Sequence, residues 1–178
     1  LAAGLHQTTG RPLVLVCPDD GEARRLAGDL GALTGREVPL LPARDFLFHP
    51  GAASRQWEHQ RLEVLAQLHQ GACPLVVATV EGLLQRTMPP AVFAAHCRQL
   101  TVGQVCQLEE LSDFLARAGY TRCDQVEGVG QFALRGGILD FFSPAHDRPV
   151  RCEFFGDEID SMGLFDPATQ RRTGNLKE

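Results

Sequence analysis

Two short, unbroken apolar runs constrain the fold of this chain more than any other feature. One covers residues 12–17 and reads Pro-Leu-Val-Leu-Val-Cys, and the other covers residues 74–79 and reads Pro-Leu-Val-Val-Ala-Thr. Runs of this length without polar alternation are typical of strands that are covered on both faces, as in a parallel sheet. The sequence therefore predicts two buried parallel strands in the first half of the chain.

Helical patterns separate these two runs. Asp19 or Asp20 can cap a helix over about residues 21–33, and Gly35 is placed to end it. A longer helix, with a serine as its cap, is expected over residues 54–70. Both helices fit the crossover connections that parallel strands require.

The remaining elements of the first half complete an alternation of strands and helices. Residues 38–42 contain two prolines and read as a short edge strand or an irregular strand. Residues 80–85 read as a short helix that stops before a pair of prolines. Residues 1–97 thus follow the order β-α-β-α-β-α, which predicts an α/β domain built on a parallel sheet.

No phosphate-binding loop accompanies this α/β pattern. Such a loop reads GxxxxGK followed by Ser or Thr, because backbone amides and the lysine hold the phosphates. The chain contains no such string, and its only lysine is Lys177. Next to the second buried strand, only the displaced Glu81 could assist a magnesium ion. We therefore expect no catalytic residues, no ATP site and no other cofactor within this chain.

Residues 98–178 change character. An amphipathic helix over residues 108–118 has apolar side chains at helical spacing. Short strands then dominate, with a hairpin turn at residues 156–158 between the last two that are expected. The strands are expected at residues 99–102, 120–126, 131–134, 137–142, 149–155 and 159–165. The sequence therefore predicts a small, mostly antiparallel α+β domain after the α/β domain.

Charge and cysteine usage narrow the class of protein. The net charge of −5 counts against a nonspecific grip on nucleic acid, which needs clustered cations. The six cysteines form no CxxC pair, and no signal peptide or membrane-length apolar run is present, so we expect reduced core cysteines in a cytoplasmic protein. The acidic cluster at residues 157–160 reads as a solvated turn, and we expect no metal site. The abrupt start at Leu1 suggests a fragment of a longer protein.

Two longer strings carry a resemblance to a known family. The first joins residues 119–122 to residues 130–142, where it reads Gly-Gln-Phe-Ala-Leu-Arg-Gly-Gly-Ile-Leu-Asp-Phe-Phe, and the second covers residues 151–166. Together they resemble the domain shared by the excision-repair protein UvrB and the transcription-repair coupling factor Mfd. UvrB carries a Tyr-rich hairpin that clamps DNA, whereas this chain has Tyr120 alone. The chain is therefore most similar to the N-terminal UvrB-homology module of the coupling factor, domains 1a and 2.

The resemblance implies a fold and a function. Residues 1–97 would form a degenerate helicase-like, RecA-type domain, and residues 98–178 would form the UvrB-like domain that binds UvrA. ATP, magnesium, RNA polymerase and DNA would engage other domains of the longer protein, and those domains would be further partners of this chain. Two alternatives stay open: a fragment of a UvrB-type ATP-dependent damage-recognition enzyme, or a structural module that masks other domains.

The resemblance also assigns a partner-binding role to four charged residues. Arg122 and Arg135 match arginines that UvrB-type domains direct toward UvrA, and on neighbouring strands they would form a fork array for carboxylates. Arg151 and Glu153 match further positions of this surface and, being two apart on a strand, would face the same way. A third arginine of the family pattern is Ala133 here, which weakens the predicted contact.

Consecutive phenylalanines supply one more candidate. In the pairs Phe141-Phe142 and Phe154-Phe155, the two rings of each pair face opposite sides of a strand. Core packing is the ordinary role of such rings, but one exposed ring would be a binding hot spot, and Phe142 is the predicted one. For Arg122 and Arg135 the alternative is a solvated or internally paired side chain, because Asp140 and other acidic residues are close in the sequence. For Arg151 and Glu153 the alternative is a plain solvent face.

Overall fold

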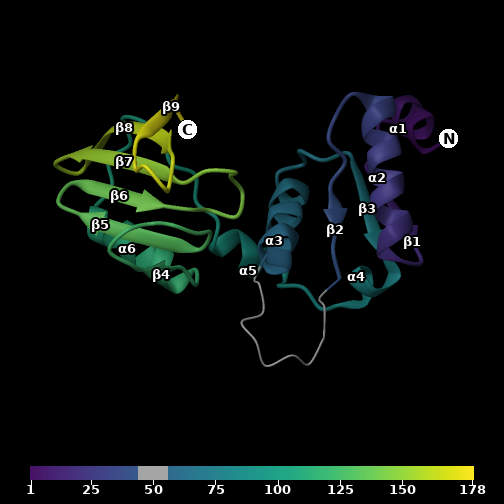
Figure 1. Cartoon of the computed structure of the whole chain (residues 1–178), viewed down its shortest axis with the longest axis horizontal. Coiled ribbons are helices and arrows are strands. Elements are labelled where there is room, and N and C mark those ends of the chain that lie inside the picture. The colour runs from purple at the N-terminus through teal and green to yellow at the C-terminus, as the bar shows by residue number, and fades with distance from the viewer. Residues whose placement is uncertain (44–55) are drawn as a thin grey trace. The chain divides into compact units, whose positions relative to one another are not determined.

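The chain folds into two compact units. The computed structural model describes residues 1–43 and 56–178. In this part of the chain the units are Leu1–Met88 and Pro89–Glu178 (Figure 1). The expected boundary after residue 97 falls inside the second unit, because the short helix α5 (Pro90–Ala95), which begins at the proline pair, groups with the residues that follow it. The serine expected to cap the long helix lies outside the described residues.

A three-stranded parallel sheet forms the centre of the first unit. Strand β3 (Leu75–Thr79) lies between β1 (Leu13–Cys17) and β2 (Leu40–Leu41), and both neighbours run parallel to it. The other elements are helices α1 (Ala2–Thr9), α2 (Asp20–Thr34), α3 (Gln56–His69) and α4 (Val80–Leu84). The predicted α/β class is confirmed, including the edge position of β2.

Helices cover the two faces of this sheet with separate apolar clusters. Leu75 and Val77 of β3 pack with Ala23 and Leu30 of α2. The alternate β3 side chains, Val76 and Ala78, form a cluster with Val64 of α3. Successive side chains of a strand point to opposite faces, so β3 is buried along its whole length.

Strand β1 is more exposed than its sequence predicts. The expectation of burial on both faces is wrong for this strand, since Val14 and Val16 are each 53% exposed. Their register partners in β3 lie on the face that α3 covers. The cluster under α3 contains residues of β2 and β3 but none of β1, so the helix does not extend over this edge strand.

Local capping explains why the helices begin and end where they do. The Asp19 carboxylate accepts a hydrogen bond of 2.9 Å from the backbone amide of Glu22, which confirms the predicted N-cap of α2. Gly35 ends the helix in the left-handed conformation, as expected. The Thr79 hydroxyl accepts from the Gly82 amide at 3.0 Å and starts α4 directly after β3.

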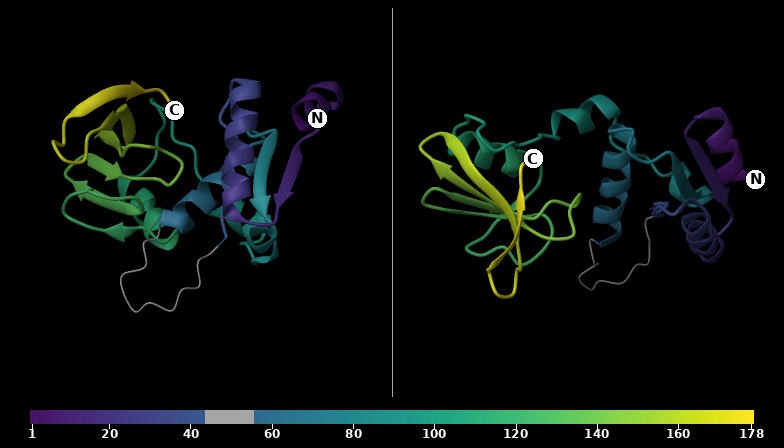
Figure 2. Two further views of the ribbon diagram at one scale, coloured as in Figure 1. Left: turned by 45° about the vertical axis from the view of Figure 1, so that its right-hand side comes forward. Right: turned by 90° about the horizontal axis from the view of Figure 1, so that it is seen from above.

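A six-stranded sheet forms the second unit, and its strands follow one another in chain order. They are β4 (Thr121–Arg122), β5 (Gln131–Arg135), β6 (Ile138–Phe141), β7 (Val150–Phe155), β8 (Glu158–Phe165) and β9 (Arg172–Leu176). Only the β4–β5 pair is parallel, so the prediction of a mostly antiparallel domain is confirmed. Figure 2 shows β9, in yellow, at the end of the chain.

Some strand predictions differ from the structure. Residues 99–102 form no strand, and the expected strand at 120–126 is only the two-residue β4. Strand β9 was not predicted, because its sequence Arg-Thr-Gly-Asn-Leu lacks an apolar alternation. It forms through antiparallel pairing with β8, so its backbone partner and not its own side-chain pattern determines this strand.

The two faces of the second sheet differ in what covers them. Helix α6 (Leu108–Arg117) packs Leu111 and Leu115 on one face against Phe132, Leu139 and Cys152. On the opposite face a smaller cluster contains Val126, Ala133, Phe142 and Phe165, and charged side chains of β5, β6 and β7 lie beside it. We call this second side, opposite α6, the charged face of the sheet.

Candidate functional site

A buried carboxylate organises the charged face. Asp140 of β6 is fully buried, and its register partners are Ala133 of β5 and Arg151 of β7. Arg151 donates to both carboxylate oxygens, from Nε to Oδ1 at 2.7 Å and from Nη2 to Oδ2 at 2.8 Å. Arg135 donates from Nη2 to the same Oδ2 at 2.6 Å. One carboxylate therefore holds two of the predicted partner-binding arginines.

Arg151 is committed to contacts within the domain. Besides Asp140, it donates to the Gln170 carbonyl at 3.3 Å, and its guanidinium lies 4.6 Å from the ring centre of Phe165. Its side chain is 17% exposed, and the hydrogen bonds to Asp140 raise the pKa of Arg151. The solvent-face alternative therefore does not describe Arg151, whose charge is paired within the domain.

Arg135 differs from Arg151 in its exposure. Its side chain is 46% exposed and donates one hydrogen bond to Asp140. Because Arg151 already contacts both oxygens of Asp140, Arg135 can turn toward a partner without leaving the buried carboxylate unpaired. Arg135 is therefore the arginine of this cluster best placed to bind another molecule.

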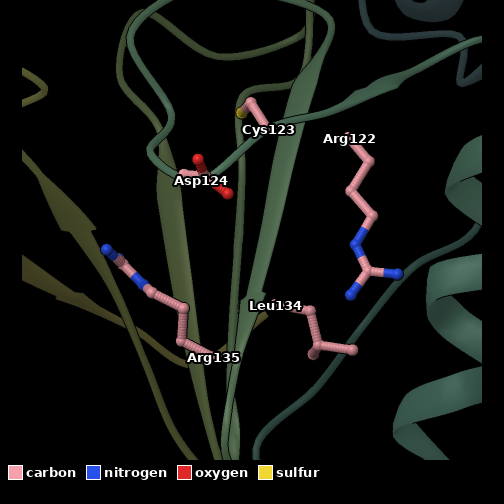
Figure 3. A pocket seen from close by; sticks show the side chains of 5 residues that line it. All are labelled: Arg122, Cys123, Asp124, Leu134 and Arg135. Atoms are coloured by element: carbon pink, nitrogen blue, oxygen red, sulfur yellow. The ribbon is translucent and has the colours of Figure 1, made fainter.

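Arg122 and Arg135 do not form the predicted fork array. Both line a shallow hollow of about 370 Å³, together with Cys123, Asp124 and Leu134. Arg122 pairs in register with Phe132, which faces α6, whereas Arg135 lies on the charged face. Figure 3 shows Arg122 on the side of Leu134 and Arg135 pointing away from both. The two side chains therefore point to opposite sides of the sheet.

Glu153 lies on the charged face, two residues after Arg151, as its spacing predicts. It accepts a hydrogen bond of 2.7 Å from the Ser161 hydroxyl, and Arg172 lies 3.6 Å from its carboxylate. Its side chain remains partly exposed. Across the sheet, Ile138 is the register partner of both Arg135 and Glu153. A cation and an anion therefore flank Ile138 in one row of the charged face.

The prediction that Phe142 is exposed is wrong. Its ring is buried in the cluster with Val126 and Phe165, because the segment between β4 and β5 folds over this end of the sheet. Phe155, which the sequence did not single out, is 84% exposed at the end of β7. The sequence signal for this exposure was its position directly before the turn at Gly156, at the end of the strand.

Thiols and metal-binding groups do not gather into a reactive centre in the described residues. Over residues 1–43 and 56–178, no group of three His, Cys, Asp or Glu side chains could hold a metal ion. The six cysteines are free, and burial raises the pKa of Cys152 to about 12. A thiol with such a pKa stays protonated and unreactive at neutral pH. In the same ranges, no helix is long and apolar enough to span a membrane.

Comparison with known proteins relates both units to one family. Residues 99–178 match the family described as "UvrB interaction domain". The whole chain is similar to "Transcription-repair-coupling factor" of Myxococcus xanthus, at 40% identity over 99% of this chain. The proteins of the same name from Escherichia coli and Bacillus subtilis are 33% and 32% identical over 96% and 98% of this chain. The chain spans about 15% of the length of these relatives.

Proposed function

Residues 99–178 belong to the UvrB interaction domain family and the chain as a whole is homologous to a segment of transcription-repair-coupling factors, so we propose that it is a docking module that binds UvrA. Through this contact it would bring nucleotide excision repair to RNA polymerase stalled at DNA damage. The observation that carries the proposal is Arg135, a half-exposed guanidinium held on a rigid sheet by a buried carboxylate. Such a charge is oriented before the partner arrives, which lowers the cost of binding.

The proposed docking surface is the charged face around Arg135 and Glu153. Opposite charges in one row can pair with a partner surface that carries the reverse order of charges. Arg151 would support this surface indirectly by holding Asp140 in place. Arg122 would contact the partner only if the partner extends around the edge of the sheet. Phe142 would support the surface as a core residue.

We propose that this chain carries out no chemistry of its own. The sequence holds no phosphate-binding string, which supports a degenerate RecA-type domain in residues 1–97 without ATP or magnesium. Translocation on DNA and binding of RNA polymerase would belong to other regions of the longer relatives, of which this chain covers a small part. The cytoplasm is the compartment in which such a module would act.

Calorimetric titration of the chain with UvrA from the same organism tests the proposal. We expect binding, and a loss of about 2 kcal/mol or more for Arg135→Ala, because an oriented charged anchor is removed. Arg117→Ala is the matched control, since this exposed arginine lies on α6, on the far side of the sheet. Absence of binding by the folded wild-type chain would contradict docking and favour the structural, masking role.

A further inference from the structure

Phe155 is the most exposed large apolar side chain of the second unit, at 84%, and Val105 follows at 73%. Scattered surface valines are ordinary in folded proteins, but a phenylalanine this exposed leaves most of its ring in water. Both residues pair with Glu158 in the sheet. We call Phe155, Glu158 and Val105 the hairpin-end patch.

The backbone pairing places the three side chains in one row. Phe155 and Glu158 form the last pair of the β7–β8 ladder, and Val105 forms an antiparallel bridge with Glu158 from the other side. Residues directly opposite each other in a sheet point to the same face. The two apolar side chains therefore flank one carboxylate.

The patch belongs to the charged face. Phe154 and Ile159, the preceding register pair, pack into the cluster under α6, so Phe155 and Glu158 point the other way. Phe155 also lies two residues after Glu153 on β7. Hence Arg135, Glu153 and Phe155 share one face of the sheet: Arg135 lies on β5, Glu153 and Phe155 lie on β7, and β6 runs between these two strands.

The exposed ring stands on a fixed backbone. Three backbone hydrogen bonds hold this hairpin end to residues 103–106. The Cys106 amide donates to the Asp157 carbonyl at 2.7 Å, and the Gly103 amide donates to the Ile159 carbonyl at 2.8 Å. The Ile159 amide donates to the Gln104 carbonyl at 2.9 Å. Gly156 takes the left-handed conformation, with φ of 61°, that the tight turn requires. Little conformational freedom would be lost when this hairpin end binds, which is a property of interface anchors.

We propose that Phe155 is the apolar anchor of the docking surface and that it enters an apolar recess on UvrA. The inference rests on the proposed function and extends it from charge pairing to a defined hot spot. Charge complementarity sets the chemistry of the recess: its rim carries a lysine or arginine facing Glu158 and Glu153, and a carboxylate lies farther along toward Arg135. Aromatic anchors ringed by polar groups dominate the energetics of interfaces of this kind.

Titration of the full 178-residue chain with UvrA tests the anchor. We expect Phe155→Ala to weaken binding about tenfold or more, and Phe155→Leu to retain most of the affinity, because an apolar side chain still fills the recess. Val92→Ala is the matched control: Val92 is exposed on α5, outside the matched domain, and its loss should leave the affinity unchanged. Thermal unfolding of each variant shows whether the fold persists, as expected for so exposed a ring.

The outcomes separate the two proposals. If wild type binds and Arg135→Ala weakens the complex while Phe155→Ala binds like wild type, docking stands and the anchor is overturned. If Phe155→Ala fails and Phe155→Leu restores binding, the anchor is supported. If the wild-type chain does not bind UvrA at all, the docking function and the anchor are overturned together.

Discussion

At the scale of single residues, the two arginines that share Asp140 should differ sharply in their effect on stability. Arg151 is largely buried and makes three hydrogen bonds, so Arg151→Ala leaves a fully buried carboxylate with one partly exposed cation. We expect the free energy of unfolding to fall by about 3 kcal/mol. Arg135→Ala should cost less than about 1 kcal/mol, since solvent screens this half-exposed pair. Urea unfolding of both variants measures the contrast, and equal losses would contradict the division of roles.

The thiol of Cys152 should make the second unit sensitive to alkaline pH. Burial raises its pKa from an ordinary 9.0 to about 12. Above pH 9 the unfolded chain therefore releases this proton while the folded chain keeps it, so stability falls as pH rises. From pH 9 toward 12, this thiol alone should remove up to about 1.4 kcal/mol per pH unit.

Urea unfolding at several alkaline pH values, with wild type and Cys152→Ala compared, isolates that contribution. The alanine variant starts from a lower stability because it leaves a small cavity, but its stability should decline less steeply with pH. Parallel declines in the two proteins would show that the thiol is not responsible.

Only part of the candidate site could be predicted from the sequence. The alternation of strand side chains predicted that Arg151 and Glu153 share a face, and the register confirms it. The same alternation could not predict which parts of a face are covered by other segments of the chain. Phe142 is buried by a segment between β4 and β5, whereas Phe155 is exposed among the residues that the structure describes. Both outcomes depend on contacts distant in the chain.

At the scale of elements, the turn from β3 into α4 depends on a glycine. A Cβ atom at Gly82 would lie 2.9 Å from the backbone carbonyl oxygen of Leu41, in the neighbouring strand β2. We expect Gly82→Ala to force the strand and helix apart and to lower the stability of the first unit by about 1–3 kcal/mol. Gly28→Ala is the matched change, because it is exposed in α2 with nothing within 4 Å, and it should stabilise by about 0.5–1 kcal/mol. Fluorescence of the single tryptophan, Trp57 of α3, follows unfolding of this unit.

Elements with strong local signals were the easiest to predict from the sequence. The Asp19 cap, the Gly35 end and the turn after Phe155 each follow from a side chain or a backbone conformation within a few residues. Arg61 shows the opposite case: it is buried and donates to carbonyls of Pro42, Gly82 and Gln85, and burial lowers its pKa. Its role in tying α3 to the residue after β2 and to helix α4 has no local signature.

At the scale of the whole molecule, each unit contains its own core. The clusters of the second unit draw only on residues after Met88, and its sheet shares no strand with the first. We therefore expect residues 89–178 alone to fold cooperatively and to bind UvrA within about twofold of the full chain, as an autonomous domain would. Circular dichroism and calorimetry measure both properties, and a folded domain with much weaker binding would place part of the docking surface in the first unit.

The order of strands has a consequence for how fast each unit reaches its native state. In the second sheet every strand lies beside its neighbour in the sequence, so each pairing closes a short loop. In the first sheet, β1 can pair only after β3 has emerged much later in the chain, because Leu13 aligns with Leu75. Folding rates fall as the sequence separation of contacts grows. In refolding from denaturant, the second unit should therefore form its sheet first. During synthesis, β1, with its exposed valines, waits unpaired until β3 has emerged, and it is the stretch most in need of protection from aggregation.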